Sequence, residues 1–173
     1  MKIVYFDPGL AGRGGHNSAM LAEFEQALRL NPNFCLAQGY YGLALAFCGR
    51  WKEGEEAAQR ALRLSPRDPF SALYYGVASY AQFVGRNYDE AMQLARTAIR
   101  LHPDFIGGYR GLTSAAGMSG QAEVAAAALH ELRRTQPNIS LAWVAALLPA
   151  RAEALDLGYH VSVSGGALFV GVV

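Results

Sequence analysis

Four short strings that contain a proline recur along the chain at a nearly fixed spacing. They read LRLNPNF, LRLSPRD, IRLHPDF and LRRTQPNI, and their prolines are Pro32, Pro66, Pro103 and Pro137. The successive prolines lie 34, 37 and 34 residues apart. A period of this length is typical of two-helix units that stack on one another. The repeat therefore predicts an all-α fold, an α-solenoid of antiparallel helical hairpins.

Each interval divides into two helical stretches at a turn that contains glycine. In the first interval CLAQGYYGLALAF is followed by CGRW and then by KEGEEAAQRALRL, whose alanines and leucines recur at helical spacing. The second and third intervals repeat this order. Since proline ends a helix and restricts the residue before it, each repeated proline is expected to end a second helix. The three extra residues of the second interval are expected in its turn, at 83–87, where an insertion disturbs packing least.

Small residues recur where two helices must approach closely. The repeat predicts that Gly42 and Gly76 occupy the same point of the first helix, and that Ala61 and Ala98 occupy the same point of the second. Large side chains at these positions would hold the helices apart.

These features resemble the tetratricopeptide repeat family. The closest stretch reads YYGVASYAQFVGRNYDEAMQLARTAIRLHPDF, and the likeness covers 18–147, with three units in register. The repeats are also similar to the tetratricopeptide region of bacterial class III adenylyl cyclases, which implies a regulatory or scaffolding role without cyclase activity. The expected organisation is an irregular start at 1–16, a repeat array at 17–148 with partial units at both ends, and a C-terminal helix with a possible β-hairpin at 149–173.

The two ends allow two interpretations. Residues 2–6 alternate like a short strand and a glycine-rich loop follows, but the third glycine of GxGxxG and the GK[ST] of a P-loop are missing. KIVYFDPGLAGRGGH and ARAEALDLGYHVSVSGG resemble the first Rossmann segment of sugar-nucleotide-dependent glycosyltransferases, which implies a truncated or rearranged enzyme with a repeat insertion. Alternatively, 159–164 and 167–173 form a hairpin across Gly165 and Gly166, which could pair with 2–6 and cap the array.

The composition argues against several functions. With a formal net charge of +1 and no basic stripe, the chain is not expected to bind nucleic acid. Its longest uncharged runs, 35–49 and 71–85, are shorter than the roughly 18 to 20 residues that cross a bilayer, and no signal sequence is evident, so no membrane association and a cytoplasmic location are expected. The cysteines and histidines show no metal-ligand spacing. We therefore expect a protein that is not an enzyme and uses no cofactor or metal.

The first helices are nearly uncharged, whereas the second helices carry the charge. In solenoids of this type the first helices line the concave surface. The expected partner is a protein or peptide, bound as an amphipathic helix or an extended apolar segment. Self-association through apolar solenoid ends is also expected. The predicted groove consists of Leu36, Tyr40, Leu43, Phe47, Phe70, Leu73, Tyr74, Val77, Arg110, Ser114 and Met118.

Overall fold

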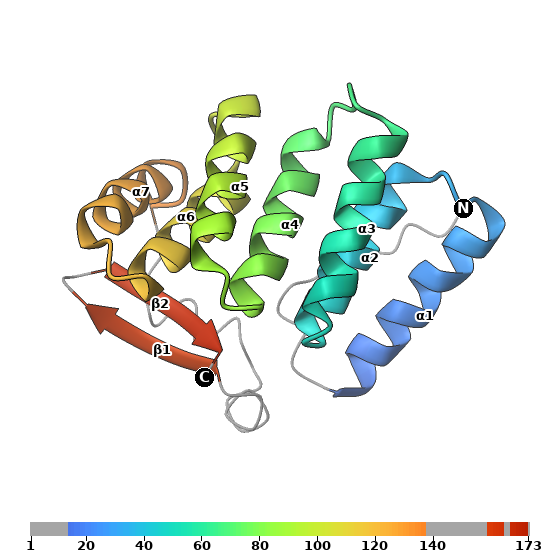
Figure 1. Ribbon diagram of the computed structural model, residues 1–173, viewed down its shortest axis with the longest axis horizontal. Helices are drawn as coiled ribbons and strands as arrows, with labels where there is room; N and C mark the ends of the chain where they lie inside the picture. The colour runs from blue at the N-terminus through green and yellow to red at the C-terminus, as the bar shows by residue number, and fades with distance from the viewer. Residues whose placement is uncertain (1–13, 138–158, 165–166, 173) are drawn as a thin grey trace.

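The computed structural model describes residues 14–137, 159–164 and 167–172 (Figure 1). These residues form seven helices and two strands. The helices are α1 (Gly14–Leu30), α2 (Cys35–Phe47), α3 (Trp51–Leu64), α4 (Ser71–Val84), α5 (Tyr88–Leu101), α6 (Ile106–Met118) and α7 (Ala122–Thr135), and the strands are β1 (Tyr159–Ser164) and β2 (Ala167–Val172). The predicted helical solenoid is confirmed.

The helices pair in the order of the sequence. Helices α2 and α3, α4 and α5, and α6 and α7 form three hairpins, and α1 packs on α2 as the second helix of an incomplete unit. Figure 1 shows the turns that join one unit to the next at the upper edge of the array, and the turns inside each hairpin at the lower edge. Each second helix ends two residues before its proline: α3 ends at Leu64 before Pro66, for example. The prolines therefore mark helix ends as predicted.

The three extra residues of the second interval do not lie in the turn of its hairpin. All three hairpin turns have the same length, at 48–50, 85–87 and 119–121. The connection before α4 spans 65–70, whereas those before α2 and α6 span only 31–34 and 102–105, and α4 itself is one residue longer than α2 and α6. The prediction of an insertion at 83–87 is wrong, because two of the extra residues lengthen the connection between units and the third lengthens α4.

Because the extra residues lie before and within α4, a different small residue of the second unit corresponds to Gly42 of the first unit. A Cβ atom on Gly42 would lie 2.6 Å from the carbonyl oxygen of Gly54, so α2 and α3 meet backbone to backbone. In the second unit the corresponding contact is a hydrogen bond of 2.8 Å from Ser79 Oγ to the carbonyl of Ala91. Ser79, and not Gly76, therefore occupies the position of Gly42. The backbone of Gly76 instead faces the Phe105 ring, whose Cε1 would lie 2.7 Å from an added Cβ.

Each hairpin turn contains one residue with a positive φ at the same place. These residues are Gly49, Arg86 and Gly120, with φ values of 75°, 62° and 77°. In each turn the amide of the following residue bonds back to a carbonyl of the first helix, as Asn87 does to Gln82 at 2.9 Å. This is a Schellman ending, which glycine satisfies without strain. Arg86 therefore adopts a conformation that costs an L residue roughly 1 kcal/mol or more.

We expect Arg86→Gly to stabilise the fold by about 1 kcal/mol, because the left-handed conformation carries no penalty for glycine. Urea unfolding followed by circular dichroism measures the change. As a matched control, Arg96→Gly in the exposed middle of α5 should cost about 1 kcal/mol. A lower unfolding midpoint for Arg86→Gly would contradict the turn geometry.

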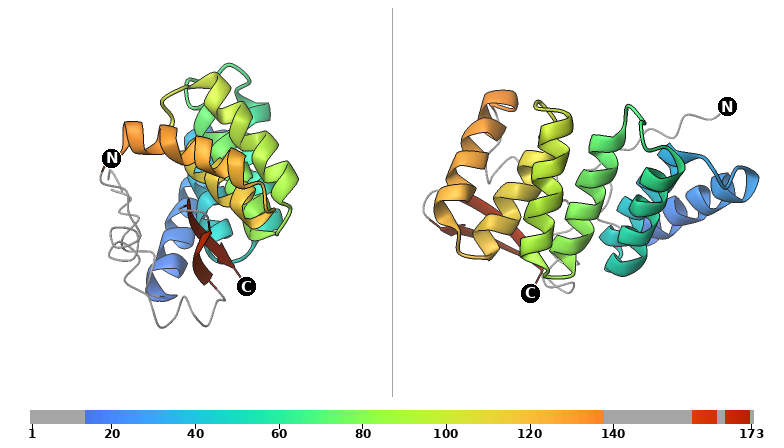
Figure 2. Two further views of the ribbon diagram at one scale, coloured as in Figure 1. Left: turned by 90° about the vertical axis from the view of Figure 1, so that its left-hand side faces the viewer. Right: turned by 45° about the horizontal axis from the view of Figure 1, so that its top comes forward.

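The two strands form an antiparallel hairpin in which Tyr159 pairs with Val172 and Ser164 with Ala167. This pairing corresponds to the hairpin interpretation of the C-terminal segment. Strand β2 lies against α6 and also contacts α7 and α4, and Figure 2 shows both strands on one side of the helical array. The expected strand at 2–6 and the expected helix after Pro149 lie outside the described residues.

Candidate functional site

The first helices of the three units form one continuous surface. Helix α2 contacts α4, and α4 contacts α6, whereas no comparable contact joins the second helices α3, α5 and α7 in the described part of the chain. The side on which neighbouring units approach most closely is the inner side of a curved stack. We call the face formed by α2, α4 and α6 the inner surface. Helices α2 and α4 carry no charged residue, and Arg110 is the single charged residue of α6.

The four predicted groove residues of the first unit belong to α2 and are half-buried. They are Leu36, Tyr40, Leu43 and Phe47. The Tyr40 ring stacks on Phe24 of α1 with centroids 6.2 Å apart, and Phe47 meets Tyr80 of α4 at 5.2 Å. Tyr40, Phe47 and Tyr80 each make a further interaction as well. Aromatic contacts therefore join α2 to α1 on one side and to α4 on the other.

In the second unit two predicted groove residues belong to the core. Tyr74 is 0% exposed and Val77 is 2% exposed, so neither is accessible to a partner in this structure. The Tyr74 ring packs on the backbone of Gly39, where an added Cβ would lie 2.6 Å from Cδ1. Phe70 is 51% exposed but precedes α4, and only Leu73 lies half-buried in the helix.

The position of the three extra residues, before and within α4, explains why the predicted α4 residues do not match those of α2. Counted from the Ser79 and Gly42 contacts, the α4 positions equivalent to Leu36, Tyr40, Leu43 and Phe47 are Leu73, Val77, Tyr80 and Val84. Tyr80 and Val84 were missed by the sequence interpretation. This register becomes visible only in the structure, where the turn residues with a positive φ, Gly49 and Arg86, also differ by 37 positions.

In the third unit the predicted residues belong to α6, the helix that makes most of the contacts with β2. Arg110 donates a hydrogen bond of 2.8 Å from Nη2 to Oε1 of Gln136, which ties α6 to the end of α7. Ser114 and Met118 are half-buried, and Met118 packs against a core cluster with residues from α4, α5, α6 and α7. Because β2 contacts α6 and α4, the hairpin covers part of the inner surface in this unit.

The described residues contain no group of His, Cys, Asp or Glu side chains that could hold a metal ion. Cys35 and Cys48 are free thiols, and burial raises the pKa of the Cys48 thiol, which reduces its reactivity. His16 and His160 belong to parts of the chain whose side chains are not described. None of the described helices is long and apolar enough to cross a membrane.

Solved structures of other proteins resemble this chain in fold, whereas comparisons by sequence find no match. No protein-family model matches the sequence, and no curated protein matches it. Among solved structures, a crystal structure of MamA is similar over 88% of this chain and 91% of the other, with 20% identity and a TM-score of 0.59. The helices share the MamA fold. MamA residues 41 to the end from Desulfovibrio magneticus RS-1 superpose on 71% of this chain and 68% of the other, at 18% identity and a TM-score of 0.59.

MamA is a helical-repeat protein of the tetratricopeptide type. Its likeness to this chain therefore agrees with the repeat deduced from the four prolines.

Proposed function

We propose that this chain is a protein-interaction module that binds a peptide or helix of a partner on its inner surface. The single observation that supports this most is the contrast between the faces: the inner surface is aromatic and almost uncharged, whereas the second helices carry most of the charge. Apolar grooves with aromatic side chains recognise amphipathic helices and extended apolar segments. The MamA-like fold supports the same role.

The accessible part of this surface is expected to be its N-terminal half. Helices α2 and α4 contribute Leu36, Tyr40, Leu43 and Leu73, all of them half-buried. Tyrosine provides a large contact area at low cost in conformational entropy, which suits it as an anchor. A partner would therefore first engage α2 and the inner side of α4, with α6 contributing where β2 leaves it uncovered.

The finer parts of the proposal follow from the resemblances in sequence. A scaffolding or regulatory role, a bacterial origin and a cytoplasmic location agree with the likeness to cyclase-associated repeats. We further propose that the chain is not an enzyme, and that it can self-associate through the ends of the solenoid. Light scattering across a range of protein concentrations tests the last point, and a strict monomer would contradict it.

Selection of peptides on the full chain from a random library tests the inner surface. We expect the selected peptides to be rich in apolar and aromatic residues and to bind with micromolar affinity. Leu36→Ser together with Tyr40→Ala should weaken binding at least about tenfold, since two buried apolar contacts of roughly 1 kcal/mol each are lost. Fluorescence polarisation with a labelled peptide measures the change.

Ala127→Ser is the control, because Ala127 is an exposed apolar residue of α7, outside the inner surface. Its affinity for the selected peptide should equal that of the unmodified chain. Failure to select any peptide, or equal affinities for all three proteins, would remove the proposal.

A further inference from the structure

The exposed large hydrophobic side chains of the described residues all lie at one edge of the array. They are Leu30, Phe34, Leu64, Phe70 and Leu101, with exposed fractions from 37% to 82%. Each lies at the end of a second helix or just before the next first helix, in the connections seen along the top of Figure 1. We call this set and the arginines beside it the inter-unit edge. Apolar side chains that recur at equivalent positions along one edge of a surface indicate an interaction site more than singly scattered ones do.

The fold does not require leucine at these positions. Leu30, Leu64 and Leu101 occupy equivalent places two residues before a proline, and in the last unit the same place holds Thr135. Likewise, Phe105 is half-buried against Gly76, whereas Phe34 and Phe70 remain exposed. Helix stacking alone therefore does not explain why these exposed positions of the edge carry leucine and phenylalanine.

Arginines accompany the leucines in the same repeat. Arg29, Arg63 and Arg100 each precede a leucine of the edge, and Arg67 lies in the longest connection. Within the described residues none of the four forms an ion pair with a carboxylate; Arg100 donates to Thr97 Oγ1 at 3.1 Å. Cations are favoured at helix C-termini by the helix dipole, which accounts for some of this charge but for none of the leucines.

The carboxylates of the edge are already engaged. Asp68 Oδ1 accepts a hydrogen bond of 2.8 Å from the Phe70 amide. Asp104 pairs with Arg134 at 2.9 Å. Arg29, Arg63, Arg67 and Arg100 therefore outnumber Asp68, whose charge no ion pair of the described residues neutralises, so the edge carries a net positive charge although the whole chain is close to neutral.

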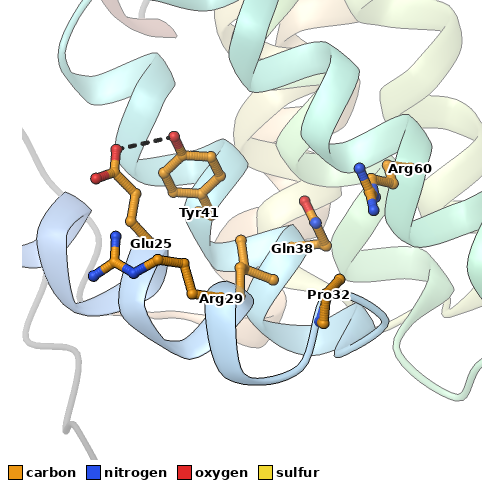
Figure 3. Close-up of a pocket in the computed structure, with 7 residues that line it drawn as sticks. Glu25, Arg29, Pro32, Gln38, Tyr41 and Arg60 are labelled. Atoms are coloured by element: carbon orange, nitrogen blue, oxygen red, sulfur yellow. Dashed lines mark hydrogen bonds between the residues drawn. The ribbon is translucent and has the colours of Figure 1, made fainter.

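At its N-terminal end the edge opens into a cleft of about 350 Å³ between α1, α2 and α3 (Figure 3). Gln38 is 6% exposed, lines this cleft, and makes no side-chain hydrogen bond with the described residues. The equivalent positions of the next two units hold Tyr75 and Tyr109. Gln38 has a shorter side chain than these tyrosines and adds an amide group to the lining of the cleft.

The remaining polar groups of the cleft favour an anionic ligand. Arg29 and Arg60 line it. Its one carboxylate, Glu25, accepts a hydrogen bond of 3.2 Å from Tyr41 Oη, drawn as the dashed line in Figure 3. Burial, followed by the charge of Glu25, raises the pKa of the Tyr41 hydroxyl, so the hydroxyl stays protonated and continues to donate.

We propose that the inter-unit edge and its cleft dock an acidic segment of a partner protein in which apolar side chains alternate with carboxylates. The apolar side chains cover Leu30, Leu64 and Leu101, and the carboxylates pair with Arg29, Arg63 and Arg67. One carboxylate enters the cleft beside Arg60 and Gln38. This edge is separate from the inner surface, so the chain would bind two partners, or two segments of one partner, at once.

The test uses the full chain and a labelled dodecapeptide in which leucine alternates with glutamate. We expect saturable binding that weakens as salt rises, because it depends on exposed charges. The variant Leu30→Ser, Leu64→Ser and Leu101→Ser should lose at least about tenfold in affinity, and so should Arg29→Gln with Arg63→Gln and Arg67→Gln. Since these side chains are exposed, thermal unfolding by circular dichroism should show that both variants remain folded.

Two controls separate this site from others. Tyr40→Ala on the inner surface should leave binding of the acidic peptide unchanged, and a peptide with glutamine in place of glutamate should bind at least about tenfold more weakly. The proposal is overturned if the glutamine peptide binds equally well, if the edge variants bind normally, or if the chain binds phosphatidylserine vesicles through these leucines but not the peptide.

Discussion

Replacing Tyr74 with alanine is expected to reduce the free energy of unfolding by about 3–5 kcal/mol, the usual cost of removing a buried aromatic ring. Tyr74 is fully buried, and its ring lies on the backbone of Gly39, between α2 and α4. Its loss would leave a cavity at the junction of two units. Urea unfolding followed by circular dichroism measures the effect.

Tyr74→Phe is the matched control. The Tyr74 hydroxyl is buried and has no hydrogen-bond partner of good geometry among the described residues, while burial and then the nearby carboxylate of Asp68 raise its pKa. Removing a hydroxyl without a partner should therefore be neutral or stabilising by up to about 1 kcal/mol. If Tyr74→Ala instead kept its stability and lost peptide binding, Tyr74 would belong to an open groove, as the sequence first suggested.

The second large effect is expected at Gly42. Its Cβ, if present, would lie 2.6 Å from the carbonyl oxygen of Gly54, and backbone atoms cannot move aside as a flexible side chain can. We expect Gly42→Val to destabilise the fold by about 3 kcal/mol, since overpacking would force α2 and α3 apart. Thermal and urea unfolding both measure this change.

Gln93→Val provides the comparison, because Gln93 is an exposed residue of α5. It introduces the same side chain into a helix where space is available, and should cost only about 0.5 kcal/mol. Equal stabilities for the two variants would show that α2 and α3 do not meet closely at Gly42.

The sequence predicts the hairpins well because the signals that define them are local. Proline cannot continue a helix, so the string around Pro66 marks the end of α3 without any knowledge of tertiary contacts. Glycine in the turns likewise marks Gly49 and Gly120. The insertion could not be placed in this way, because both a longer turn and a longer connection between units agree with the spacing of 37 residues between Pro66 and Pro103.

That single ambiguity also determines the error at the candidate site. Counting α4 three residues out of register turns its predicted face by about 60° around the helix axis, since each residue advances about 100°. This rotation placed the core residue Tyr74 in the predicted groove and left Tyr80 and Val84 out. In α2, where no insertion intervenes, the predicted residues Leu36 and Tyr40 are half-buried and do not belong to the core.

The inter-unit edge could not be predicted from periodicity. Leu30, Leu64 and Leu101 recur in register with buried residues, which favours a place in the core. Their exposure depends on how closely neighbouring units stack, and this is a property of the assembled array.

Hydrogen exchange of the full chain, with and without a peptide selected on it, tests the central claim most directly. If the inner surface binds the peptide, backbone amides of α2 (Cys35–Phe47) and α4 (Ser71–Val84) should gain protection, while those of α3 (Trp51–Leu64) and α5 (Tyr88–Leu101) should not change. Protection confined to α3 and α5, or no change in any helix under saturating peptide, would contradict the account.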